Sequence, residues 1–257
     1  MGEWDAAQYL KFEEERTQPS SDLLNRINTE NPQKIIDIGC GPGNSTALLS
    51  GRFTDSQITG IDNSEKMIEK ASTAYPSLSF LLCDAGKDLQ TAGNDYDIVF
   101  SNACIQWIPN HHELIKNMFG MLRKGGILAV QMPMNQDEPF YRIIDKTAED
   151  EKWGLNGKEL ELNETLSPPE YHDILSELSD DFSVWETIYY HRMKSCESLA
   201  EWAKGSRLRP YLQALSPQKA EMFVNEIVKK AETAYKVQKN GEIIFRFRRF
   251  FFLIRRQ

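Results

Sequence analysis

Apolar residues along the chain gather into short runs that end in turn-forming residues. Five such runs, each containing Ile, Val, Leu or Phe, lie at 34–38, 58–61, 78–82, 96–101 and 127–132. Continuous apolar runs of this length are typical of strands that are buried on both faces of a sheet. Most of the intervening stretches have helical spacing, and 65–74, for example, follows Asn63 and Ser64 as capping residues. The order predicts an α/β fold with a mostly parallel sheet and helices on both faces.

The pattern changes after residue 133, where helical segments dominate. Helices are predicted at about 140–152, 168–178, 195–204 and 218–234, and strands at 182–190 and 242–254. Two local sequence signals, one with proline and one with glycines, predict helix boundaries. Pro19 to Ser21 predicts a break in the N-terminal helical segment, and the basic stretch 122–126, which ends in two glycines, predicts a helix end with a glycine cap.

We expect one domain with four parts. They are an N-terminal helical flap at 1–30, a core at 31–191, a helical lid at 192–241 and a last strand at 242–257. The flap would place Tyr9 and Arg16 on one helix face, where an aromatic ring and a cation could cover a ligand or simply pack on the domain.

The candidate chemistry begins at 34–45, KIIDIGCGPGNS, where the first apolar run passes into glycines at alternate positions. Gly39, Gly41 and Gly43 would let a ligand approach the backbone at the start of a helix. Asp37 precedes this turn, and Asp62 ends the second apolar run. A carboxylate at the tip of the second strand suits a ribose with two free hydroxyls.

The glycine spacing separates two cofactor classes. Dinucleotide sites favour G-x-G-x-x-G, whereas this chain has D-x-G-x-G-x-G followed by G-x-D. The pair resembles the class I S-adenosylmethionine (SAM)-dependent methyltransferases. That resemblance implies that the acid and the loop amides face the amino-acid end of SAM, and that an acid after the third strand reads the adenine. The cofactor residues expected on this basis are Arg16, Asp37, Gly39, Cys40, Gly41, Asn44, Asp62, Asn63, Met67, Asp84, Ala85, Asn102 and Ala103.

Composition narrows the possible partners. The 257 residues carry a net charge of −8, and the pI is near 5.2, which argues against a nucleic-acid backbone as partner. No apolar run is long enough to span a membrane, and no signal peptide is visible. The four cysteines have no paired spacing, so we expect reduced thiols in a cytoplasmic protein. We also expect the protein to be a monomer or weak dimer. His111 and His112 lack partners at ligand spacing, and we interpret them as cap and surface residues, with no metal.

Several further segments are similar to one subgroup, the trans-aconitate 2-methyltransferases, across essentially the whole chain. They are W-D-x-x-x-Y-L-x-F at 4–12, E-R-x-x-P at 15–19, D-I-G-C-G-P-G-N-S-T at 37–46, G-I-D-N-S at 60–64, N-A-x-x-Q-W at 102–107, L-A-V-Q-M-P at 128–133, Y-Y-H-x-M at 189–193 and L-R-P-Y-L at 208–212. The resemblance implies a seven-stranded, Rossmann-like sheet whose last strand runs antiparallel beside the fifth. It also implies esterification of one carboxylate, with S-adenosylhomocysteine released.

A carboxylate acceptor fits the residues available. A carboxylic acid with a pKa of about 4 is already ionised at neutral pH, so no catalytic base is expected. A polycarboxylate calls for arginines, and cations near the cleft are Arg192, Arg207, Arg209, Arg246, Arg248 and Arg249. The expected substrate residues are Tyr9, Gln106, Trp107, Tyr190, His191, Arg209, Arg246 and Arg248. The chain departs from the subgroup at Arg207, where a glycine is usual, and at Phe247-Arg248-Arg249, where F-P-R is usual.

Three other interpretations remain open. The acceptor could be another carboxylate or a hydroxyl, in which case His191 is the candidate base near a strand tip. A non-catalytic SAM-binding module is disfavoured by the intact acids and glycines, and measured SAM turnover would separate the two. An NAD-dependent dehydrogenase is disfavoured by the glycine spacing.

Overall fold

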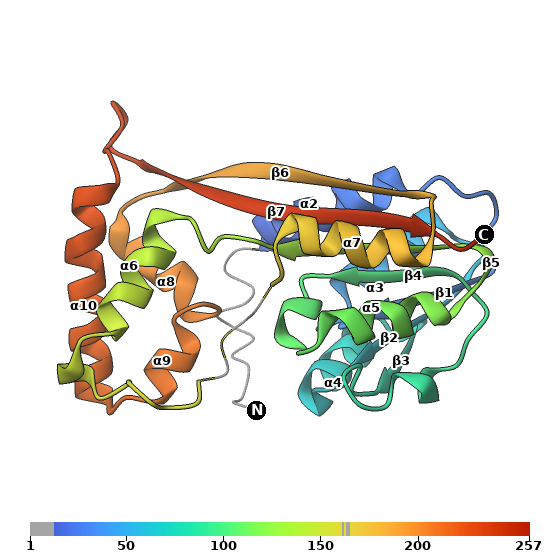
Figure 1. Cartoon of the computed structure of the whole chain (residues 1–257), viewed down its shortest axis with the longest axis horizontal. Helices are drawn as coiled ribbons and strands as arrows, with labels where there is room; N and C mark the ends of the chain where they lie inside the picture. Colours follow the sequence, from blue (N-terminus) through green and yellow to red (C-terminus); the bar gives the residue numbers. More distant parts are fainter. Residues whose placement is uncertain (1–12, 161, 163–164) are drawn as a thin grey trace. The chain divides into compact units, whose positions relative to one another are not determined.

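Seven strands form one mixed sheet in the order β3-β2-β1-β4-β5-β7-β6 (Figure 1). The structure is a computed structural model that describes residues 13–160, 162 and 165–257, and at 13–16 it describes the backbone. The strands are β1 (Lys34–Ile38), β2 (Gln57–Asp62), β3 (Ser79–Leu82), β4 (Tyr96–Asn102), β5 (Leu122–Pro133), β6 (Phe182–Met193) and β7 (Ile243–Arg255). The helices are α2 (Glu13–Arg26), α3 (Asn44–Arg52), α4 (Glu65–Ala74), α5 (His111–Gly120), α6 (Pro139–Ala148), α7 (Pro168–Leu178), α8 (Cys196–Lys204), α9 (Arg209–Gln213) and α10 (Pro217–Ala234). Short 3₁₀ turns lie at Leu89–Ala92, Ile105–Trp107 and Glu151–Trp153.

The strand directions place the candidate residues at one edge of the sheet. β1 pairs in parallel with β2 and β4, β2 with β3, and β4 with β5. The C-terminal ends of β1, β2 and β4, which carry the glycine turn, Asp62 and Asn102, therefore share an edge. β7 runs antiparallel to β5, with Gln131 opposite Phe251 and Pro133 opposite Arg249. The predicted fold class, including the antiparallel last strand beside the fifth, is confirmed.

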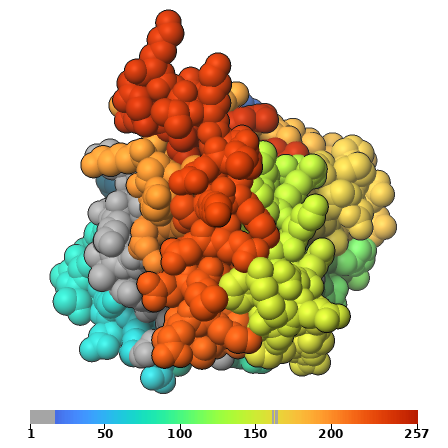
Figure 2. All heavy atoms as spheres, turned by 90° about the vertical axis from the view of Figure 1, so that its left-hand side faces the viewer, coloured from blue at the N-terminus to red at the C-terminus, as the bar shows by residue number. Residues whose placement is uncertain are grey.

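The chain divides into two compact units. The core unit comprises Arg16–Pro133, Glu164–Thr187 and Arg249–Gln257; the described part of the helical unit comes from Met134–Asn163 and Ile188–Arg248. The sequence predicted a lid at 192–241, and the helical unit that contains this range also includes α6. In the helical unit α10 packs along α6, and both reach its surface (Figure 2).

Burial explains why the apolar runs of β1 and β4 became strands, whereas β3, predicted from the run at 78–82, is mostly exposed. β1 and β4 are almost completely enclosed, and Ile35, Ile36 and Val99 have no exposed surface. Burying a side chain of this size contributes about 1.5–3 kcal/mol relative to leaving it in water. The helical unit has its own apolar cluster, in which the Trp153 and Phe223 rings meet edge to face at 5.1 Å. Each unit is thus built around buried side chains of its own.

Two predicted boundaries are wrong. The expected break at Pro19 is absent, because α2 continues through it and buries Leu23 and Leu24 on one face. The predicted helix end at 122–126 is the start of β5, since α5 already ends at Gly120. Gly125 has a left-handed φ of 80°, but its N–H donates to the Arg256 carbonyl and so belongs to the sheet. Pairing across the sheet overrode the local glycine signal at this point.

Candidate functional site

The turn between β1 and α3 requires glycine for two different reasons. Gly39, Gly41 and Gly43 all have positive φ angles, of 73°, 54° and 94°, which side chains rarely adopt. A Cβ on Gly39 would lie 2.2 Å from the Cys104 sulfur, so this position is closed by neighbouring protein. A Cβ on Gly41 would meet nothing within 4 Å, so the turn is open there. A ligand can approach the backbone at Gly41.

The amides of this turn are used inside the protein. Gly39 N–H and Cys40 N–H both donate to the Ile61 carbonyl, at 2.8 and 2.9 Å, and Gly41 N–H donates to Asp62 Oδ2 at 3.0 Å. These three amides therefore have acceptors within the protein, and the expectation that loop amides face the cofactor stays a prediction. The bonds tie the glycine turn to the end of β2, because backbone donors enclosed by protein must find acceptors.

Asp37 is a buried ionisable group of the core unit. Its side chain is fully buried, and its Oδ2 accepts hydrogen bonds from Ser45 Oγ at 2.6 Å and Thr46 Oγ1 at 2.7 Å. Its other oxygen, Oδ1, is buried without a hydrogen-bond partner. Burial raises the pKa of Asp37 to about 6, with a smaller push from the charge of Asp62, while the two hydroxyls oppose the rise. An unpartnered carboxylate oxygen here suits a cationic ligand, so the residues present fit the amino-acid end of SAM.

Asp62 has a structural role that the sequence did not predict. Besides Gly41, it accepts a hydrogen bond from the Ser64 N–H at 2.9 Å through Oδ1. Burial raises its pKa, and the backbone hydrogen bonds from Ser64, Gly41 and Asn63 lower it. Each carboxylate oxygen can accept more than one bond, so the side chain can hold the turn and still accept from ribose hydroxyls.

The remaining cofactor candidates differ in their surroundings. Asp84 accepts from the Gly86 N–H at 2.9 Å and pairs with Lys87 Nζ at 3.0 Å. Met67 is buried and Asn63 is exposed. Cys40 is buried, Asn44 and Ala85 are partly buried, Tyr9 lies outside the described residues, and the Arg16 side chain is likewise outside them. Hydrogen bonds thus hold Asp37 on α3 and Asp62 on the glycine turn, whereas the adenine contact of Asp84 stays a prediction.

Hydrogen bonds of Ala103 with Gln131 and Gln106 hold the chain after β4. Ala103 has a φ of 53°, and its N–H donates to the Gln131 carbonyl at 2.8 Å. Gln106 is buried, and its Nε2 donates to the Ala103 carbonyl at 2.7 Å. Gln106 therefore stabilises the loop through its Nε2, and its predicted contact with substrate stays a prediction. Trp107, also predicted to line the cleft, is partly buried.

His111 corrects another prediction. It was expected to be a cap or surface residue, like the exposed His112, but it is buried between α5 and α7. Its Nδ1 lies 2.6 Å from the Tyr171 hydroxyl and its Nε2 lies 2.9 Å from the Ile105 carbonyl. Both ring nitrogens thus face fixed partners in the fold. Within the described residues, no group of three His, Cys, Asp or Glu side chains could hold a metal ion.

The substrate candidates of the helical unit fall on different faces. Tyr190 is 63% exposed, whereas the next residue, His191, is buried against Trp202 and Phe247, with ring centroids at 5.1 and 5.5 Å. Neighbouring residues of a strand point to opposite faces, so these two side chains serve different surfaces. Packing among aromatic rings suits His191 to a structural role.

The arginines also separate by their contacts. Arg246 is exposed, and Arg248 follows it on the same face of β7, as predicted, with its Nε donating to the Met134 carbonyl at 2.7 Å. Arg209 is the first residue of α9 and is partly buried, so it lies in a short helix where the sequence predicted a turn. Arg207 and Asp145 form an ion pair at 2.6 Å.

Sequence reasoning missed several residues that bind the candidate side chains or their backbone. Asn135 is buried, and its Oδ1 accepts from the Arg248 N–H at 2.7 Å. The hydroxyls of Ser45 and Thr46 hold Asp37, and their position in the first turn after the glycines was the available signal. Nothing local in the sequence marks Asn135, because its partner lies 113 residues away.

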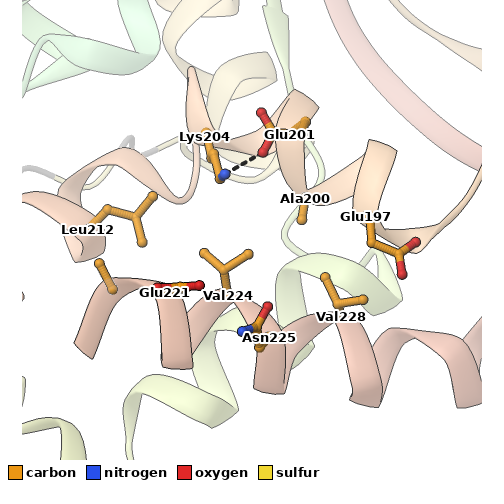
Figure 3. A pocket seen from close by; sticks show the side chains of 10 residues that line it. Glu197, Ala200, Glu201, Lys204, Leu212, Glu221, Val224, Asn225 and Val228 are labelled. Atoms are coloured by element: carbon orange, nitrogen blue, oxygen red, sulfur yellow. Dashed lines mark hydrogen bonds and ion pairs between the residues drawn. The ribbon is translucent and has the colours of Figure 1, made fainter. Parts of the chain in front are cut away.

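The helical unit also contains a hollow of about 540 Å³ between α8, α9 and α10 (Figure 3). Its lining combines apolar side chains such as Leu212 and Val224 with Glu197, Glu221 and the ion pair of Lys204 with Glu201. No residue predicted for cofactor or substrate lines it. It is therefore separate from the site that the sequence predicted.

Comparisons with known proteins agree with this chemistry. Residues 36–130 match the family model described as a methyltransferase domain. Curated proteins named trans-aconitate 2-methyltransferase are 37% identical in Methylobacterium radiotolerans, covering 100% of this chain and 99% of that protein, and 39% identical in Agrobacterium fabrum, covering 96% and 97%. The protein of that name from Escherichia coli K12 is 38% identical, covering 100% and 99%.

Solved structures support the fold. The YcgJ protein of Bacillus subtilis superposes with a TM-score of 0.63 at 13% identity, covering 94% of this chain and 99% of that one. A phosphoethanolamine N-methyltransferase of Haemonchus contortus, solved with S-adenosylhomocysteine, has a TM-score of 0.56 at 18% identity and covers 93% of this chain and 53% of that one. At these identities the likeness shows the fold alone. No described helix has the length and apolar character needed to cross a bilayer.

Proposed function

Because the chain belongs to the trans-aconitate 2-methyltransferase family, whose members use SAM, we propose that it esterifies one carboxylate of trans-aconitate and releases S-adenosylhomocysteine. The observation that carries the proposal is the full-length identity of 37–39% to three proteins of that name. We further propose a cytoplasmic location, which agrees with the four free cysteines, and a monomeric or weakly dimeric state.

The cofactor residues would bind different parts of SAM. When bound, SAM supplies a methyl group on a positively charged sulfur. Asp37, with its unpartnered Oδ1, would take the ammonium of the amino-acid end, and Asp62 would take the ribose hydroxyls. Gly41 leaves room for the ligand beside the turn. These residues bind and orient, and proximity of this kind can lower a barrier by several kcal/mol.

The acceptor needs orientation and a cationic setting. Its carboxylate is already ionised at neutral pH, so the enzyme needs no general base. We assign Arg209, Arg246 and Arg248 to the acceptor, since guanidinium groups bind carboxylates through paired N–H donors. His191 is a poor candidate base for a hydroxyl acceptor, because it is packed among aromatic rings. This contact favours the carboxylate over the hydroxyl.

The direct test is product identification. The protein is incubated with SAM and trans-aconitate, and the product is analysed by mass spectrometry before and after mild alkaline hydrolysis. We expect one added methyl group that alkali removes, as for an ester. A methylated product that resists alkali would contradict carboxyl transfer, and absence of S-adenosylhomocysteine with every acid would contradict the proposed function itself.

A further inference from the structure

A chain of three side chains crosses the C-terminal edge of the core unit, from β7 through β5 to β4. Arg249 Nη1 donates to Gln131 Oε1 at 3.0 Å, and Gln131 Nε2 donates to Asn102 Oδ1 at 2.5 Å. Gln131 has no exposed surface and Arg249 is 4% exposed, while Asn102 at the tip of β4 is partly exposed. The chain therefore runs from buried protein to the edge where ligands bind in such sheets.

The direction of every bond in this chain is set by the arginine. A guanidinium has five N–H donors and no acceptor, so the Gln131 atom facing Arg249 must be the carbonyl oxygen. The NH₂ of Gln131 then faces Asn102, whose oxygen must accept. The NH₂ of Asn102 consequently points away from Gln131. An asparagine alone could turn either end outward, but this one is fixed.

The backbone is held by the same residue. The Ala103 N–H donates to the Gln131 carbonyl at 2.8 Å, and Ala103 has the left-handed φ of 53°. A non-glycine residue in that region is strained and persists only where its surroundings hold it. Gln131 and Gln106 supply that hold, by binding the amide and the carbonyl of Ala103. Side chain and backbone at the tip of β4 are thus both preset.

We infer that Arg249 and Gln131 are positioning residues that turn Asn102 into a fixed hydrogen-bond donor for a carboxylate oxygen at the methyl-transfer site. The inference deepens the proposed function and rests on it for the location of that site. Two ligands of the reaction carry such a group, namely the amino-acid end of the cofactor and the acceptor acid. The shared chemistry is a carboxylate, and the experiment below separates the two sources.

Two substitutions would make the side chain at position 102 present an oxygen outward in place of the NH₂ donor, and neither makes a side chain smaller. Gln131→Glu keeps an acceptor for Arg249 but offers Asn102 only oxygens, so the Asn102 amide must turn its NH₂ inward and its oxygen outward. Asn102→Asp leaves Gln131 and Arg249 untouched and presents an oxygen outward directly. Gln57→Glu makes the same charge change at an exposed position at the start of β2, and it serves as the matched control.

Binding is measured by calorimetry with S-adenosylhomocysteine, which has a carboxylate, and with 5′-methylthioadenosine, which lacks one. The KM for trans-aconitate is measured separately. A donor to a charged group is worth about tenfold or more in affinity. We expect Asn102→Asp and Gln131→Glu each to weaken the binding of one carboxylate ligand by about that factor, while the affinity for 5′-methylthioadenosine stays unchanged.

Loss confined to S-adenosylhomocysteine would assign the donor to the cofactor, and a rise confined to the KM of the acid would assign it to the acceptor. Equal losses for all three ligands, or affinities equal to those of the control, would overturn the inference. Asn102→Asp tests it even if Gln131→Glu fails to fold. Because calorimetry needs no turnover, a protein that binds S-adenosylhomocysteine but does not methylate trans-aconitate would refute the proposed function and still test this inference.

Discussion

Replacing Asp37 by asparagine separates the charge of this residue from its shape. The asparagine oxygen can still accept from Ser45 and Thr46, which hold Asp37 at 2.6 and 2.7 Å. The charge, however, is lost from a side chain with no exposed surface. The variant therefore reports on what an ionised carboxylate costs the fold and what it contributes to the ligand.

The magnitude follows from the pKa. The carboxyl has an ordinary pKa of 3.8, and burial raises the pKa of Asp37 to about 6 in the folded protein. A raised pKa means that the folded state holds the proton more tightly than the unfolded chain. The resulting stability is fully present below pH 3.8 and is lost as the pH rises through 6. The whole effect is about 3 kcal/mol, of which about 1 kcal/mol is lost between pH 5 and pH 7.

Urea unfolding without ligand is the assay, at pH 5, 6 and 7. We expect the free energy of unfolding of the wild type, relative to Asp37→Asn, to fall by about 1 kcal/mol over this range. The control variant Asp55→Asn, at an exposed position, should have a free energy of unfolding that falls relative to Asp37→Asn by the same amount as that of the wild type. A gap between the wild type and Asp37→Asn that stays constant across the three pH values would refute the reasoning.

Ligand binding should show the opposite trend. A cationic ligand needs the ionised carboxylate, and a group of pKa about 6 is about one-tenth ionised at pH 5 and about nine-tenths ionised at pH 7. The affinity for S-adenosylhomocysteine should therefore rise by about tenfold across that range in the wild type. In Asp37→Asn it should be weak and nearly independent of pH. Equal affinity in the two proteins at pH 7 would remove Asp37 from the cofactor site.

Three further substitutions test the remaining assignments. Asp62→Asn should lower the affinity for S-adenosylhomocysteine by tenfold or more and also lower thermal stability, because Asp62 holds the Gly41 amide. A loss of affinity without a loss of stability would mean that the glycine turn does not depend on Asp62. Arg209→Ala should raise the KM for the acid by about tenfold or more while SAM affinity changes little, and equal effects on both would show a structural role. Arg207→Met should lower stability by about 1–3 kcal/mol, because it leaves Asp145 without its ion pair, and a matched Asp145→Asn variant that lowers it equally would support the pair.

The sheet was predictable because its signal is local. Each buried strand is a continuous apolar run, and the glycines and Asp62 follow those runs directly, so parallel pairing brings them to one edge. The family resemblance supplied the antiparallel place of β7, which no local pattern shows. At Pro19 and at 122–126 the local signal was misleading, since burial of Leu23 and pairing of β5 outweighed it.

The candidate site was predictable only in part, because side chains find partners far along the chain. Arg207 lies where the sequence predicted an extra cation for the acid, yet it pairs with Asp145, 62 residues away. Gln106 was expected to contact substrate, and its Nε2 binds the Ala103 carbonyl while the substrate contact stays a prediction. His111 was expected at the surface and meets Tyr171, 60 residues away. Residue type and spacing predict which side chains have the chemistry to bind a ligand. Only the folded structure shows which of them already bind other residues of the protein.

The central claim is methyl transfer to a carboxylate of trans-aconitate, and the most direct measurement is kcat/KM over a panel of di- and tricarboxylic acids. S-adenosylhomocysteine formation is followed, and each product is identified by mass spectrometry. The account predicts rapid monomethylation of trans-aconitate, with citrate and cis-aconitate poor. Turnover confined to a different acid would contradict the substrate while keeping the reaction, and would direct attention to Arg207 and Arg248, where the chain departs from the family pattern.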